Sequence, residues 1–288
     1  MATFNIEQQT KSKAKQTGRQ LSHAAANPWV ERLARFGYLV RGLVYATIGV
    51  LAVQLAIGAG GKATTQSGAI AMLGSQPFGK GLLILIVLGL ASYSLWGFVR
   101  AIFDPLHRGN DSKGIVARIG FAFSGLSYGL LMIPPLQSLT NQGGSQSGAN
   151  PADISVQLFN LPFGKWLVMG LGLFWIAVGL GQLYTAYKQD FKKDFQFNTM
   201  SADERKWATR LGQIGYAARG IVFAVIGTII VQAAQTHNPA QAQGFDTALL
   251  KLAQAPNGTL LLGGVALGLV AFGIYSAFCA RWIKVGAG

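Results

Sequence analysis

The sequence is poor in the residues from which metal sites, disulfides and polar active sites are built. Among 288 residues there is one cysteine, Cys279, so no intrachain disulfide, thiolate metal site or CxxC redox pair can form. The three histidines, His23, His107 and His237, lie outside the apolar stretches and lack a second ligand at metal-binding spacing. Asp and Glu total only ten and offer no pair placed for general acid and base catalysis. We therefore predict no catalytic residues, no metal site, no cofactor and no enzymatic activity.

Charged residues are scarce, at 12% of the chain, whereas hydrophobic residues make up 51%. About 20 consecutive apolar residues are needed to cross a hydrocarbon layer roughly 30 Å thick. Six stretches are this long: Phe36–Gly58, Gly81–Phe103, Ile119–Leu139, Trp166–Tyr187, Ile214–Gln235 and Thr259–Ile283. They are apolar on every face, unlike the alternating strands of a β-barrel. We predict an all-α integral membrane protein with six transmembrane helices.

Basic residues outnumber acidic ones, 24 against ten, and they gather on one side of the predicted helices. The N-terminal tail, the second and fourth loops and the C-terminus carry most of them, whereas the other three loops hold only Lys62, Lys80, Lys165 and Lys251. Loops rich in Lys and Arg tend to stay in the cytoplasm, so both termini are predicted to be cytoplasmic. Residues 1–28 are predicted to form a basic, disordered tail. The net charge of +14 has no nucleic-acid recognition fold beside it, and we expect anionic membrane lipid, not nucleic acid, as its partner.

The chain repeats one two-helix unit three times, at residues 29–107, 112–196 and 204–285. The first helix of each copy opens with glycine and an aromatic residue, at Gly37-Tyr38, Gly120-Phe121 and Gly215-Tyr216. Because each copy crosses the membrane twice, all three copies insert in the same direction. We predict three parallel helical hairpins in a pseudo-threefold bundle. Glycines seven apart on one helix face, Gly42 with Gly49 and Gly220 with Gly227, are predicted to form packing seams.

The second helix of each copy follows a marker of proline, a variable residue and glycine. The marker reads Pro-Phe-Gly-Lys at Pro77–Lys80 and Pro162–Lys165, and Pro-Asn-Gly-Thr at Pro256–Thr259. Such residues suit a turn before a helix N-terminus. A short helix at the outer membrane interface is predicted before each marker, at Ser67–Leu73, Ile154–Leu161 and Phe245–Leu252. Pro134-Pro135 is predicted to kink or shorten the third span near its outer end.

These motifs resemble the bacterial membrane family catalogued as domain of unknown function 1206. The resemblance rests on Gly-Tyr-x-x-Arg-Gly at Gly37–Gly42 and Gly215–Gly220, on the two Pro-Phe-Gly-Lys markers, and on Gly-Leu-x-x-aromatic runs at Gly89–Trp96 and Gly268–Tyr275. It covers nearly everything after Trp29. It implies a three-hairpin, six-helix fold in a bacterial cytoplasmic membrane and supplies no activity. Copy two has Ser124 where the others have arginine, so a role of that arginine is not threefold here.

Two arginines, Arg41 and Arg219, are the charged residues well inside the predicted spans, where charge is costly enough to suggest function. Each lies within about 6 Å of the predicted cytoplasmic helix end, a distance that an arginine side chain can reach by snorkelling. Two interpretations stay open: interfacial anchors, or contacts for lipid phosphate or another anion. Further interfacial anchors are predicted at Trp29, Trp207, Tyr38 and Tyr216.

One glutamine recurs seventeen residues after the first glycine of every copy, at Gln54, Gln137 and Gln232. Around a threefold axis these amides would form a polar ring, as a pore requires. Seventeen residues of helical rise is about 25 Å, which instead places them near the outer headgroups as interfacial or capping amides.

The sequence favours a structural or interaction protein that organises membrane lipid or a membrane-protein complex. The alternative is a small passive channel or carrier for a neutral or small solute, because serines and threonines in the spans provide polar groups for a narrow path. An ion-coupled carrier is disfavoured, since no ionisable group falls near the predicted bilayer midplane.

Overall fold

The computed structural model describes residues 28–105, 109, 111–140, 157–159, 161–238 and 244–284, and its regular elements are helices. The long helices are α2 (Pro28–Ala56), α4 (Gly79–Phe103), α5 (Ser112–Leu131), α8 (Gly164–Lys188), α9 (Ala202–Thr236) and α11 (Gly258–Trp282). Shorter helices are α3 (Gln66–Gly74), α6 (Ile133–Leu139), α10 (Phe245–Gln254) and the 3-10 turns η1 (Asp190–Asp194) and η2 (Phe197–Thr199). Six segments are long and apolar enough to cross a membrane, which confirms the predicted six spans.

The third span is divided, as Pro134-Pro135 predicts. α5 ends at Leu131, and α6 begins at Ile133 with proline in its first turn, where a missing backbone N–H is tolerated. Three helices that follow loops begin with side-chain caps, and the first is α3, where Thr65 accepts a hydrogen bond from the Gly68 N–H. Asp111 accepts a hydrogen bond from the Gly114 N–H ahead of α5, and Ser201 forms a capping box with Glu204 ahead of α9.

The three markers adopt the same left-handed backbone. Phe78, Phe163 and Asn257 have φ values of 66°, 64° and 57° and directly precede α4, α8 and α11. Asparagine tolerates this conformation better than most residues, which explains why copy three keeps the turn without the phenylalanine. The following glycine is needed because a Cβ at Gly79 would lie 1.7 Å from the Gly74 carbonyl oxygen. Of the short helices predicted before the markers, α3 and α10 are present. Within Ile154–Leu161, residues 157–159 are helical, and residues 154–156 and 160 lie outside the described residues.

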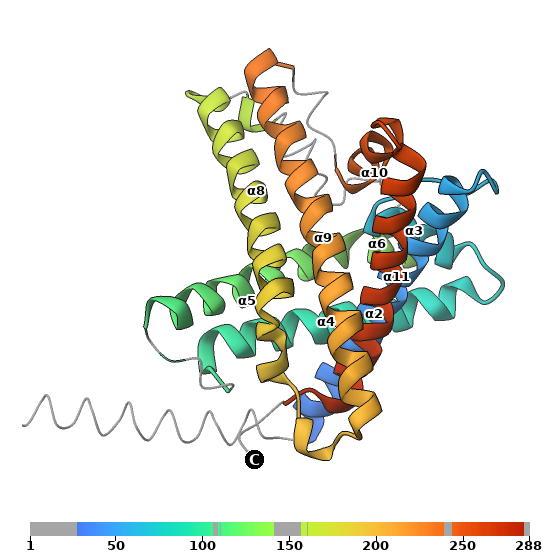
Figure 1. Cartoon of the computed structure of the whole chain (residues 1–288), viewed down its shortest axis with the longest axis vertical. Coiled ribbons are helices and arrows are strands. Elements are labelled where there is room, and N and C mark those ends of the chain that lie inside the picture. Colours follow the sequence, from blue (N-terminus) through green and yellow to red (C-terminus); the bar gives the residue numbers. More distant parts are fainter. Residues whose placement is uncertain are drawn as a thin grey trace, which may run out of the picture.

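The helices pack both within a copy and between neighbouring copies. α2 packs against α4 and α11, α9 packs against α8 and α11, and α4 packs against α5. In Figure 1, α8, α9 and α11 run from top to bottom while α4 and α5 run across them, so the six helices are not all aligned. α5 and α8, the two spans of copy two, meet through the rings of Phe123 and Phe174, whose centroids are 4.9 Å apart.

Glycine marks where the helices approach most closely. A Cβ at Gly42 on α2 would lie 2.7 Å from the carbonyl oxygen of Gly273 on α11. Gly227 on α9 meets the Gly172 carbonyl oxygen on α8 in the same way, at 2.6 Å. Both predicted seams therefore exist, and small residues in them let the backbones touch. A Cβ at Gly37 or Gly215 would meet the second helix of the same copy, at Tyr93 or Phe272. A Cβ at Gly120 of copy two would have nothing within 4 Å, so the two helices of that copy are not in close contact there.

The end of copy two, after α8, is held against the bundle by two buried phenylalanines. Phe191 and Phe195 are 3% and 2% exposed, and the Phe191 ring stacks on Tyr216 of α9 at 5.4 Å. The backbone is tied to the end of α11, because Gln196 N–H donates to the Trp282 carbonyl at 2.9 Å. The backbone between these phenylalanines is therefore held in place against the bundle.

Candidate functional site

Arg41 is buried between three helices and not at the outer surface of the bundle. It is 4% exposed. Its Nε and Nη2 donate to Ser276 Oγ on α11 at 3.2 and 3.0 Å, and its Nη1 donates to the Tyr93 hydroxyl on α4. Its guanidinium also lies 4.6 Å from the Tyr38 ring centroid and 4.9 Å from that of Phe272. Hydrogen bonds and aromatic faces thus compensate the buried charge, and no carboxylate among the described residues forms an ion pair with it.

Arg219, the counterpart in copy three, is held more weakly. It is partly buried on α9, and its guanidinium lies 4.4 Å from the Phe272 ring and 5.1 Å from the Tyr45 ring. Phe272 occupies the place that Tyr93 has in copy one and offers no hydroxyl. The Nε of Arg219 is buried and donates no hydrogen bond within the described residues. The two arginines that sequence comparison treats as equal therefore have different surroundings, and they share the Phe272 ring.

A third arginine, Arg100, is also buried, although the sequence did not single it out. It is 5% exposed at the end of α4, with its guanidinium 4.3 Å from the Phe121 ring of α5 and 5.7 Å from the Trp96 ring. The sequence did contain a signal for this burial: the spacing of Tyr93, Trp96 and Arg100 places their side chains on one helix face. Arg100 lies near the end of the predicted span Gly81–Phe103, and its burial arises because α5 covers this end of α4.

The predicted interfacial anchors divide into two kinds. Trp29 and Trp207 are 67% and 56% exposed, and the structure leaves them available to the headgroup layer. Tyr38 is 2% exposed and packs edge-on against Tyr93 at 5.1 Å, so it lies in the interior and not where an interfacial anchor must lie. Tyr216 is half-buried among the rings of Phe191, Phe272 and Tyr275. Both tyrosines belong to the core, where aromatic rings pack around the buried guanidinium groups.

The three recurring glutamines share no contact among the described residues. Gln54 and Gln232 are exposed and Gln137 is half-buried, whereas a ring around a central path needs inward-facing side chains. Gln232 instead accepts a hydrogen bond from Lys251 Nζ at 2.6 Å, across from α9 to α10. This placement favours the interfacial interpretation of the amides.

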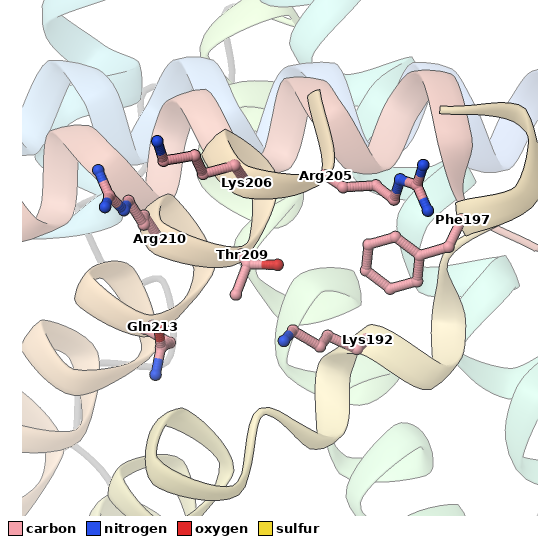
Figure 2. A pocket seen from close by; sticks show the side chains of 7 residues that line it. All are labelled: Lys192, Phe197, Arg205, Lys206, Thr209, Arg210 and Gln213. Atoms are coloured by element: carbon pink, nitrogen blue, oxygen red, sulfur yellow. The ribbon is translucent and has the colours of Figure 1, made fainter. Parts of the chain in front are cut away.

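A basic hollow, missed from the sequence, opens at the start of α9. It has a volume of about 560 Å³ and is lined by Lys192, Phe197, Arg205, Lys206, Thr209, Arg210 and Gln213. Figure 2 shows the Lys192 ammonium and the Thr209 hydroxyl facing each other across it, with Arg205 beside the Phe197 ring. The available signal was the run of phenylalanines and lysines at Phe191–Phe197 before a helix start rich in basic residues. We call this site the basic hollow.

No group of three or more His, Cys, Asp or Glu side chains in the described part of the chain is arranged to hold a metal ion. Cys279 is buried in α11 at 1% exposure. The chemistry that the site residues offer is binding of negative charge.

A family model described as Domain of Unknown Function (DUF1206) matches the chain three times, at residues 36–104, 119–189 and 214–282. The resemblance inferred from the motifs is thereby confirmed. The chain is also similar to the uncharacterized protein YxxB of Bacillus subtilis (strain 168), with 35% identity over 249 residues that cover 86% of this chain and 90% of that protein. No solved structure matches the chain.

Proposed function

The chain belongs to the DUF1206 family of multi-pass membrane proteins, and we propose that it is a structural protein of the bacterial cytoplasmic membrane that holds anionic lipid around its cytoplasmic end. It organises lipid and, through that lipid, a membrane-protein partner. Both chain termini lie on the cytoplasmic side in this proposal, and the three hairpins are arranged around a pseudo-threefold axis.

The observation that carries the proposal is the collection of exposed cations at one end of the molecule. The start of α9 and the end of α11 lie together at the lower end of Figure 1. Exposed basic residues there include Arg205, Lys206, Arg210, Arg281 and Lys284. Each Lys or Arg near an anionic membrane surface contributes about 1 kcal/mol of attraction. Such an array attracts several anionic headgroups at once.

Equivalent glycine seams support the pseudo-threefold arrangement. Each seam joins the second helix of one copy to the first helix of the next: α4 to α5, α8 to α9, and α11 to α2. In the first of these, a Cβ at Gly97 would lie 2.7 Å from the Gly125 Cα. The same type of contact at all three junctions is what a threefold ring of hairpins requires.

The buried arginines support a structural role over transport. A carrier needs its intramembrane charges to meet solute, yet the Arg41 guanidinium is bonded to Ser276 and Tyr93 from two other helices. These contacts join α2, α4 and α11, so Arg41 acts as a structural link between the three helices. Arg100 similarly joins α4 to α5 through Phe121.

Removal of the exposed cations outside the basic hollow tests the proposal. In the fourfold variant Arg32→Gln, Lys188→Gln, Arg281→Gln and Lys284→Gln, we expect at least a twofold fall in anionic lipid per protein, because electrostatic enrichment depends on the number of basic residues. Protein purified with native lipids is compared with the whole-membrane extract by lipid mass spectrometry.

Wild-type protein whose bound lipid has the same composition as the surrounding membrane contradicts the proposal. Conduction of a solute into liposomes by the purified protein would replace it with the channel or carrier hypothesis. A variant with charge-neutral changes on the opposite end, Gln54→Asn and Gln76→Asn, serves as the matched control and should keep the wild-type lipid content.

A further inference from the structure

The basic hollow has features that a diffuse layer of lipid around the protein does not require. Its volume of about 560 Å³ accommodates a phosphate group with the atoms attached to it. Four of its seven lining residues are cationic, Lys192, Arg205, Lys206 and Arg210. Within the described residues none of these four forms an ion pair; Lys193 takes the nearby Asp190 carboxylate at 2.7 Å, and Glu204 accepts the Ser201 N–H at 2.8 Å. Asp190 and Glu204 are therefore engaged elsewhere, while Asp194 and Asp203 lie two residues from Lys192 and Arg205 in the sequence.

We infer that the basic hollow is a specific phosphate-binding site, formed by Lys192, Arg205 and Thr209 with Lys206 and Arg210 at its rim. The inference extends the proposed function, since it adds one defined site to the diffuse basic face. The ligand class is a phosphate group, carried either by an anionic phospholipid or by a small soluble compound.

The two walls of the hollow come from segments that are fixed relative to each other. Lys192 lies in η1, and Arg205 and Thr209 lie one helical turn apart on one face of α9. Phe191 holds η1 against α9, because its ring meets Tyr216 and a Cβ at Gly212 would lie 2.6 Å from it. Gln213 closes the inner end by donating to the Ala186 carbonyl at 3.4 Å. The backbone of η1 that carries Lys192 is therefore held opposite α9 before any ligand arrives, which reduces the ordering cost of binding.

The donors in the hollow match phosphate in kind. Arginine presents a planar fork that pairs with two phosphate oxygens, lysine supplies a point charge, and the Thr209 hydroxyl donates one further hydrogen bond. In Figure 2, Arg205 and Thr209 come from α9 and Lys192 comes from the opposite wall, so donors approach the hollow from two sides. The Phe197 ring at the edge offers apolar contact to the atoms beyond the phosphate.

The position along α9 places the hollow at headgroup depth. α9 has 35 residues and is about 52 Å long at 1.5 Å per residue, well beyond the roughly 30 Å hydrocarbon thickness. The apolar stretch of α9 is predicted to begin at Ile214, and this boundary would place Arg205–Gln213 in the headgroup layer. Trp207, 56% exposed in the same turn, is the residue type typical of this layer.

The test compares a hollow variant with a variant of equal charge elsewhere on the same face. Lys192→Gln with Arg205→Gln removes two cations from the hollow, and Arg32→Gln with Arg281→Gln removes two exposed cations outside it. Detergent-purified proteins are titrated with phosphatidylglycerol by native mass spectrometry and, separately, with inorganic phosphate by calorimetry. Size-exclusion chromatography and thermal unfolding check that each variant is folded.

We expect the hollow variant to lose tenfold or more in affinity for the phosphate-bearing probe and the control to lose less than threefold, because charge-assisted hydrogen bonds contribute about 1.5–3 kcal/mol each. Saturable binding of phosphatidylglycerol alone identifies a lipid headgroup, and binding of inorganic phosphate identifies a soluble ligand. Equal losses in both variants overturn the specific site while leaving the basic face as proposed. Wild-type protein that binds neither probe overturns the site outright.

Discussion

Gly273→Leu should destabilise the folded protein by roughly 3 kcal/mol, because the substitution forces α11 away from α2. A Cβ at Gly273 would lie 2.8 Å from the Gly42 carbonyl oxygen and 2.9 Å from the Ala46 Cβ. The obstructing atoms belong to backbone and to a side chain of one carbon, so no rotamer change relieves the overlap. Separation of the helices would also loosen Arg41, whose partner Ser276 lies one turn beyond Gly273. Unfolding in mixed micelles with increasing SDS measures the loss.

Gly264→Leu is the matched control on the same helix. Nothing lies within 4 Å of the position where its Cβ would be placed, so the added side chain extends into open space or lipid. The expected change is within about 0.5 kcal/mol of wild type. Equal destabilisation by the two substitutions would show that α2 and α11 do not form the close seam described above.

Arg41→Lys should cost about 2 kcal/mol of folding free energy although it keeps the charge. Lysine has no planar fork, so it cannot bond Ser276 through two nitrogens while also reaching Tyr93 as Arg41 does. The desolvated charge would remain with fewer hydrogen bonds and weaker stacking on Tyr38 and Phe272. The same SDS titration provides the measurement.

Arg219→Lys is the appropriate comparison, because the two arginines occupy the same place in their copies. Arg219 is partly exposed and its Nε has no acceptor in the described structure, so less than about 1 kcal/mol should be lost. A double-mutant cycle of Arg41→Lys with Ser276→Ala should show positive coupling. Additive effects of that pair, or a larger loss for Arg219→Lys than for Arg41→Lys, would contradict the role of Arg41 as a structural link between α2, α4 and α11.

The spans and the repeat were accessible from the sequence because both depend on local patterns. Apolar runs of more than twenty residues identify helices that must satisfy their own backbone in lipid, whatever their neighbours are. The markers at Phe78, Phe163 and Asn257 were also visible as turns, since their left-handed backbone is set by the adjoining glycine.

The surroundings of individual polar residues were not accessible, because they depend on which helices meet. Tyr38 and Tyr216 are of the residue type that anchors helices at the interface, but both lie inside. Tyr38 packs against Arg41 and Tyr93, and Tyr216 packs among the rings of Phe191, Phe272 and Tyr275. The burial of Arg100 could not be predicted, because the helix that covers it, α5, belongs to the next copy. The basic hollow could not be predicted, because the distance between Lys192 and α9 depends on the contacts that Phe191 makes with rings of copy three.

The direction in which the basic end faces is the most direct test of this account. In a Cys279→Ala background, single substitutions Asn198→Cys at the basic end and Gln76→Cys at the opposite end place exposed thiols at the two faces. Intact spheroplasts are treated with a membrane-impermeant maleimide before and after permeabilisation. The account predicts labelling of the Gln76→Cys protein in intact spheroplasts and of the Asn198→Cys protein only after permeabilisation, and the reverse pattern would contradict it.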